Sequence, residues 1–171
     1  MLSELLRPEQ DNEGPWPLLM MVSGYAAMER ESEKIDPIDL IKALYIVDLE
    51  HLMKFWDDWE GFERLVSNQR LGNGQSRMYI NRMHYLIYLE QMRASHEPNR
   101  IYLYPPVSPK MQKIVNGARA LASKREGGPS TPTSRDLLFC ACSYDPDLQT
   151  ALKKSGLQIE KLAAAVGETV S

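Results

Sequence analysis

The sequence predicts an all-α fold in which two pseudo-symmetric four-helix units, residues 17–67 and 107–167, are separated by a basic insertion, 68–106, that carries a helix of its own. Three observations support this prediction. Apolar residues recur at three- and four-residue spacing along most of the chain, which is the pattern of helices buried on one side. Helix-start signals occur repeatedly. Sliding the chain by 97 residues brings the two units into register.

Composition indicates one helical domain over residues 16–171, after a flexible lead-in at residues 1–15. The chain has 171 residues, of which 43% are hydrophobic and 25% charged, and these values are typical of a globular domain. No apolar run is long enough to cross a membrane. Two cysteines do not make a disulfide framework and no signal-peptide pattern is visible, so we expect a cytoplasmic location.

The first unit contains three predicted segments. A helix from Pro17 has apolar residues at Leu18, Met21, Val22, Tyr25 and Met28. Asp36 and Pro37 form a strong helix start, because aspartate caps the free N–H groups and proline has no N–H to leave unpaired. The third segment, residues 49–67, is predicted to form two short helices broken near Gly61.

The second unit follows the same order. Ser108, followed by proline, opens a helix. Thr133 and Asp136 form a capping box with aspartate in place of glutamate. Asp145 starts the next helix, and Gly156 ends it. The last helix is predicted from the apolar residues Ile159, Leu162, Ala163 and Val166.

The offset of 97 residues aligns capping residues with capping residues and apolar positions with apolar positions. Such a duplication predicts two similar helical units that each bury an apolar face against the other. The aligned pairs are Asp36 with Thr133, Asp39 with Asp136, Leu40 with Leu137, Ala43 with Cys140, Asp48 with Asp145, Trp59 with Gly156, Phe62 with Ile159, and Leu65 with Leu162.

This unit resembles the repeat of the N-terminal domain of Clp-type AAA+ unfoldases (the double Clp repeat). The residues that carry the resemblance are a capped Asp-Leu-Leu helix within 133–142 and the helix, glycine and helix of 148–162. The first copy is more divergent, with Trp-Glu-Gly at 59–61 where the family has glycine, a hydrophobic residue and an acidic one. Residues 48–55 are similar to the ClpV branch, which serves disassembly of the type VI secretion sheath.

The resemblance implies a non-catalytic domain that binds a peptide, helix or adaptor in a hydrophobic groove and delivers it to an AAA+ ATPase. The groove would involve the first helix and the acidic, aromatic segment near residues 56–60. Position, rather than a motif, selects Met21, Tyr25, Trp56 and Trp59 as candidate partner-binding residues. Carboxylates beside the two tryptophans suit either a basic peptide or a solvated face.

Two departures from the family qualify this expectation. The family keeps the connection between repeats short, whereas residues 68–106 lengthen it here. The chain also lacks the GxxxxGK[ST] loop that cradles phosphates, so we expect no ATP binding by this chain and no cofactor. Cys140 and Cys142 point about 200° apart on a helix, and the histidines lack ligand spacing, so no metal site is expected and the chain is not expected to be an enzyme.

The basic middle of the chain offers an alternative function. Residues 65–125 contain ten Lys or Arg and two Glu, and Arg77, Arg82 and Tyr85 belong to an interleaved basic and aromatic stretch. That stretch is compatible with an ordinary amphipathic helix, a protein interface, or a site for nucleic acid or another polyanion, the least favoured of the three.

A predicted helix at residues 77–94 should pack on the body and turn its arginines toward the acidic segment 29–64. If this contact is made within one chain, the protein is a monomer, which we favour. The alternative is a dimer, in which the contact is made between two copies. No membrane partner is expected.

Overall fold

The computed structural model describes residues 16–68, 105–125 and 131–169. Within these ranges the chain forms seven α-helices and one short 3-10 helix, and its only β-pairing is two isolated bridges. The predicted all-α class is therefore confirmed. Among the described helices, none has the length and apolarity that a bilayer crossing requires. The expected lead-in and the expected helix at 77–94 lie outside the described residues.

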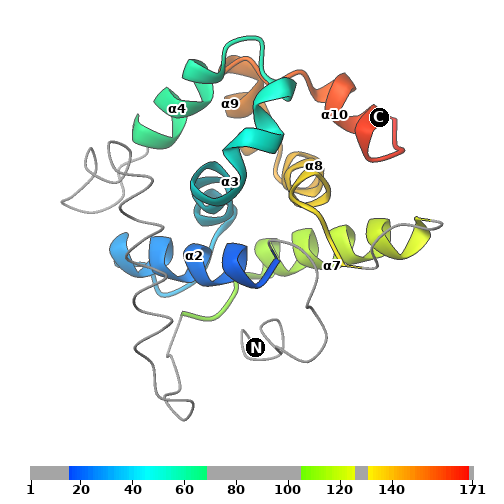
Figure 1. The fold of residues 1–171 in the computed structure, drawn as a ribbon. Coiled ribbons are helices and arrows are strands. Elements are labelled where there is room, and N and C mark those ends of the chain that lie inside the picture. The colour runs from blue at the N-terminus through cyan, green and yellow to red at the C-terminus, as the bar shows by residue number, and fades with distance from the viewer. Residues whose placement is uncertain (1–15, 69–104, 126–130, 170–171) are drawn as a thin grey trace.

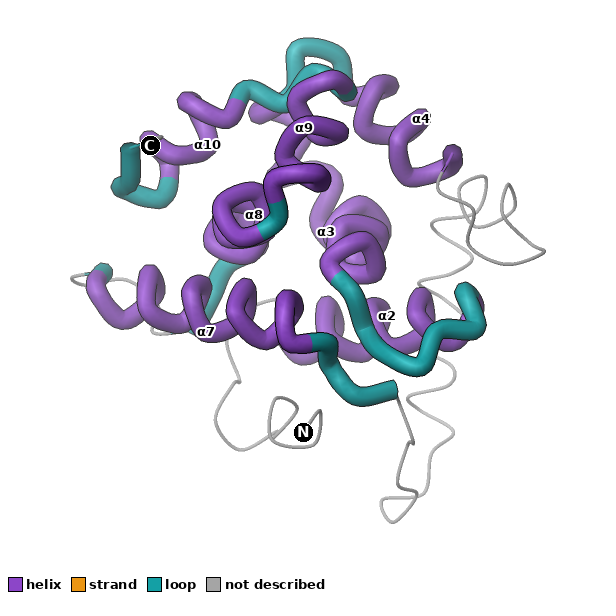
Figure 2. The backbone as a smooth tube through the Cα atoms, turned by 180° about the vertical axis from the view of Figure 1, so that it is seen from behind, coloured by secondary structure: helices purple, strands orange, loops and turns teal. Residues whose placement is uncertain are grey.

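The helices form three layers (Figure 1). One outer layer contains α2 and α7, the middle layer contains α3 and α8, and the opposite outer layer contains α4, α9 and α10; Figure 2 shows the same order from behind. The elements are α2 (Trp16–Glu29), α3 (Pro37–Leu52), η1 (Met53–Phe55), α4 (Trp59–Asn68), α7 (Pro109–Lys124), α8 (Ser134–Tyr144), α9 (Pro146–Lys154) and α10 (Ile159–Ala165).

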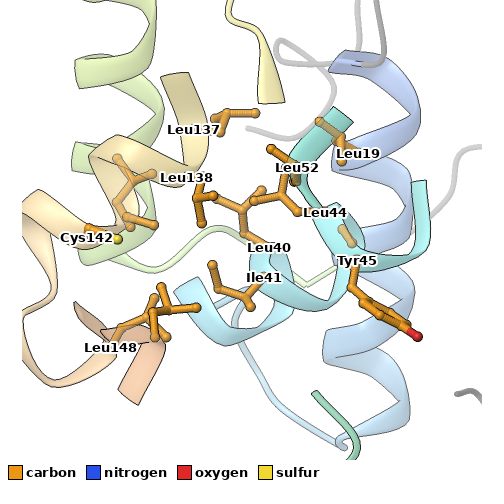
Figure 3. Close-up of a cluster of buried hydrophobic side chains, with 14 of the residues drawn as sticks. Leu19, Leu40, Ile41, Leu44, Tyr45, Leu52, Leu137, Leu138, Cys142 and Leu148 are labelled. Carbon is orange, nitrogen blue, oxygen red and sulfur yellow. The ribbon is translucent and has the colours of Figure 1, made fainter. Parts of the chain in front are cut away.

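The hydrophobic core is centred on the two middle helices. Leu40 and Leu44 of α3 lie in one cluster with Leu137 and Leu138 of α8, and all four have no exposed area (Figure 3). Burying one such leucine contributes about 1.5–3 kcal/mol to folding. Because α3 and α8 contact both outer layers, their packing sets the position of every other helix.

Helix α2 is more deeply buried than its predicted apolar stripe indicates. Met28, which the spacing placed on the apolar face, is 48% exposed, so that part of the prediction is wrong. The reason is that α2 has apolar and small residues on most sides, so the spacing of its apolar residues does not single out one buried face. Its polar residue Ser23 can be buried because the hydroxyl donates to the Leu19 carbonyl at 2.7 Å. The buried residues of α2 are Leu19, Met20, Val22, Ser23, Gly24, Ala26 and Ala27.

The predicted helix starts are confirmed. Asp36 is the N-cap of α3 with Pro37 in the first turn, Thr133 is the N-cap of α8, and Asp145 is the N-cap of α9. The Asp145 side chain accepts from the Leu148 N–H at 3.2 Å. The starts at Thr133 and Asp145 are encoded locally, because each cap needs only its own side chain and the next three residues. The Asp36 carboxylate instead accepts from Arg30 Nη2 at 3.1 Å.

The predicted break near Gly61 is wrong: the chain leaves helical geometry at residues 56–58, and Gly61 lies inside α4. Asp58 starts α4 by accepting from the Glu60 N–H at 3.0 Å. Gly61 is needed for packing instead, because a Cβ added there would lie 2.0 Å from the Ser155 carbonyl oxygen. The glycine lets α4 approach the end of α9.

We therefore expect Gly61→Ala to destabilise the protein by about 2–3 kcal/mol, because the new methyl group meets fixed backbone. Gly117→Ala is the matched control, since it also lies in a helix but its Cβ would meet side chains rather than backbone: the exposed ring of Tyr144 at 2.7 Å, which can move, and Cys140 Sγ at 3.3 Å. The control should change stability by less than about 1 kcal/mol. Urea unfolding of both variants tests this, and equal losses would contradict the proposed close contact.

Candidate recognition surface

Two buried carboxylates organise the starts of the middle helices. Asp39 of α3 accepts from the Asp36 N–H at 2.8 Å, and Asp136 of α8 accepts from the Thr133 N–H at the same distance. Both aspartates have no exposed area. A buried carboxylate is costly unless it is paired and hydrogen-bonded, so each of these needs a cation.

In each case the cation is an arginine that directly follows the preceding helix. Arg30, just after α2, holds Asp39 with Nε at 3.0 Å and Nη2 at 2.8 Å. Arg125, just after α7, donates from Nη2 to Asp136. The hydrogen bond with Asp39 raises the pKa of Arg30 above its usual value. Each pair thereby ties the end of one helix to the start of the next.

The two halves of the chain are joined by backbone hydrogen bonds in two places. Gln158 N–H donates to the Phe55 carbonyl at 2.7 Å, and Asp57 N–H donates to the Gly156 carbonyl at 3.1 Å. In the second place, Ile35 pairs with the segment before α7: its N–H donates to the Pro106 carbonyl at 2.8 Å, and its carbonyl accepts from Ser108 at 2.9 Å.

Trp56, a predicted partner-binding residue, lies inside the protein. It is 5% exposed and stacks on Phe62 with ring centroids 4.1 Å apart and planes 8° apart. Its Nε1 donates to Ser155 Oγ at 3.0 Å. Contacts within the chain occupy both its ring face and its single hydrogen-bond donor, so Trp56 holds α4 against the end of α9.

Trp59 is the exposed tryptophan of this segment. It is the first residue of α4 and is 38% exposed. Asp57, Asp58 and Glu60 beside it are also exposed, and we call these four residues the Trp59 surface. Arg64 contacts Asp58 at 3.4 Å and Glu60 at 3.9 Å, and it partly neutralises this surface.

Two other predicted partner-binding residues are not brought together with Trp59. Met21 and Tyr25 lie on α2, in the outer layer opposite α4, with α3 between them (Figure 1). Tyr25 is half-buried and packs against the core, and the side chain of Met21 is not among those described. Arg77, Arg82 and Tyr85 also lie outside the described residues. The four residues chosen by position therefore do not line one groove.

A depression that the sequence did not indicate lies between the end of α3 and the start of α8. Its volume is about 220 Å³, and its lining is Asp48, His51, Lys54, Thr133, Ser134 and Arg135. The residues come from segments about 80 positions apart, so no spacing rule joins them. The one signal available was the predicted packing of the two capped helices against each other.

Both cysteines lie in the hydrophobic core. Cys140 and Cys142 are buried, and desolvation raises the pKa of each thiol to about 12. Such thiols stay protonated at neutral pH and are poor nucleophiles. Within the described ranges, no cluster of three or more His, Cys, Asp or Glu residues is placed to hold a metal ion.

No family model matches this chain, and no curated protein or solved structure matches it. The resemblance to the Clp-type domain therefore depends on the capped helix within 133–142 and on the helix, glycine and helix of 148–162.

The two tryptophans should respond differently to truncation. Trp56→Ala removes a stacked, hydrogen-bonded indole and should cost about 3–5 kcal/mol of stability. Trp59→Ala removes a side chain that is 38% exposed and should cost less, about 1–2 kcal/mol, because only part of its surface is buried. Urea unfolding followed by far-ultraviolet circular dichroism measures both without relying on tryptophan fluorescence. A loss for Trp59→Ala as large as that for Trp56→Ala would show that Trp59 is a core residue.

Proposed function

We propose that this chain is a duplicated helical protein-recognition module, similar in plan to the N-terminal domain of Clp-type unfoldases, and that it binds a protein segment rather than catalysing a reaction. The observation that carries the proposal is the pair of equivalent contacts Arg30–Asp39 and Arg125–Asp136. In both halves, a buried aspartate at the third position of a helix is held by an arginine from the end of the preceding helix, and this is a specific arrangement. Its presence in both halves favours a common origin.

Further correspondences support the duplication. Asp48 interrupts α3 with non-helical angles (φ −134°, ψ 31°), and 97 residues later Asp145 separates α8 from α9. The helix before each cap packs on the capped helix, α2 on α3 and α7 on α8. These correspondences support a Clp-like order of elements, and the 97-residue offset also pairs Asp48 with Asp145.

The alignment needs a change on each side of the capped helices. Before them, Arg30 and Arg125 are 95 residues apart rather than 97, and after Asp145 the offset changes again. Residues 55–57 and 156–158 form a symmetric antiparallel pairing, in which Gln158 donates to Phe55 and Asp57 donates to Gly156. The symmetry makes Phe55 equivalent to Gly156 and Asp57 equivalent to Gln158, and these equivalent residues are 101 positions apart rather than 97. The pairing of Trp59 with Gly156 at a constant offset is therefore replaced in our proposal by Trp56 with Leu157. Four extra residues add about one helical turn, so the buried face is kept.

The Trp59 surface is the proposed docking point. Exposed tryptophans surrounded by polar groups often contribute most of the binding energy of an interface. Carboxylates around the indole favour a cationic partner and disfavour nucleic acid. We propose a lysine-rich amphipathic segment as the ligand. A substrate, adaptor or secretion-sheath helix bound for an AAA+ ATPase fits this class.

A peptide titration tests the proposal. The full chain is mixed with a fluorescent, lysine-rich amphipathic helical peptide, and anisotropy is recorded. Trp59→Ala should weaken binding about tenfold or more, as for an interface hot spot. Met28→Ala is the matched control, because Met28 is also exposed but lies on α2 in the opposite layer, and it should leave the affinity unchanged within about twofold.

Three outcomes would contradict the proposal: equal affinity for the lysine-rich peptide and its glutamate-rich counterpart, no loss on Trp59→Ala, or preferential, strongly salt-dependent binding of single-stranded DNA. The last result would move the function to the basic middle of the chain.

A further inference from the structure

We infer that the depression between the end of α3 and the start of α8 binds a phosphate-type oxyanion. This inference is independent of the recognition surface, since the depression has a different lining from the Trp59 surface. Three features of the lining support it: a buried hydroxyl without a partner, the free amides of a helix start, and cationic side chains from both halves of the chain.

The hydroxyl belongs to Ser134, the first residue of α8. Ser134 is 3% exposed, and among the described side chains its Oγ is the buried polar atom without a hydrogen-bond partner. Buried hydroxyls are nearly always paired, so an exception calls for a ligand or another explanation. Because Ser134 lines the depression, an oxyanion seated there would offer the missing acceptor.

The backbone around Ser134 adds further donors. The N–H groups of Ser134 and Arg135 occupy the first two positions of α8, where a helix offers no internal acceptor. The third N–H, that of Asp136, is already used by Thr133 Oγ1 at 3.3 Å. The eleven residues of α8 also place the positive end of the helix dipole at this point. Helix starts of this kind suit phosphate groups.

The charges of the lining favour an anion. Arg135 comes from α8 and Lys54 from η1, and neither forms an ion pair within the described ranges. The Lys54 ammonium lies over the Phe55 ring, 5.3 Å from its centroid. Asp48 is the acidic residue of the lining, and its carboxylate is already in contact with His51 Nδ1. An oxyanion would thus link a lysine of the first half to the helix start of the second half.

The size of the depression fits a small ligand. About 220 Å³ is enough for a phosphate group with a modest organic substituent. The shared chemistry is therefore that of inorganic phosphate or a phosphate monoester. Because a ligand that binds only the folded state raises its stability, binding can be read from thermal unfolding.

The test is a titration of the full chain with inorganic phosphate, by thermal unfolding and by calorimetry, against chloride at matched ionic strength. We expect the unfolding midpoint to rise with phosphate and to saturate, and not to rise with chloride. O-phosphoserine in a parallel titration distinguishes the sources. Tighter binding than phosphate indicates a monoester ligand, and weaker binding indicates the free ion.

Two variants and one control make the result specific to this site. Ser134→Ala should leave the midpoint without phosphate unchanged or higher, because it removes an unpaired hydroxyl, yet it should weaken phosphate binding about fivefold. Arg135→Gln should weaken binding about tenfold, as for a charge-assisted hydrogen bond. Lys113→Gln removes an exposed cation from α7 and should leave phosphate binding unchanged.

The inference is overturned if phosphate gives no shift beyond that of chloride. It is equally overturned if the shift survives in both Ser134→Ala and Arg135→Gln, or if Lys113→Gln lowers it as much as they do. The last result would mean that phosphate acts through general surface charge.

Discussion

The fold depends on two buried carboxylates, those of Asp39 and Asp136, and on the arginines that neutralise them. Each carboxylate holds the backbone N–H at the start of a middle helix and the guanidinium at the end of the helix before it. One side chain therefore fixes both where a middle helix starts and how the outer helix approaches it. Removing an arginine would leave a buried charge unpaired, which is far more costly than losing a surface ion pair.

With α3 and α8 fixed in this way, the opposite layer is positioned by contacts between the halves. The stack of Trp56 on Phe62 and the close approach of Gly61 to Ser155 hold α4 against α9. These contacts use the inner side of the segment and leave Trp59 partly exposed among carboxylates. The recognition surface that we propose is therefore a consequence of how the two halves meet.

Local features of the fold were predictable from the sequence and long-range ones were not. The starts at Asp36, Thr133 and Asp145 are set by neighbouring residues, so their positions were correct. The break at residues 56–58 was misplaced, because Gly61 serves a contact with Ser155, which is 94 positions away. Trp56 and Trp59 looked alike in sequence, since only tertiary packing separates a stacked indole from an exposed one. The depression at Ser134 was missed for the same reason: its lining joins two distant segments.

The central claim is that Arg30–Asp39 and Arg125–Asp136 are equivalent structural pairs, and a double-mutant cycle on each pair tests it most directly. The cycles use Arg→Gln and Asp→Asn, with urea unfolding as the measurement. We predict that each single variant loses about 3 kcal/mol and that both pairs show coupling above about 1.5 kcal/mol. Coupling below about 0.5 kcal/mol in either pair would contradict the account, because that value is typical of residues that do not interact.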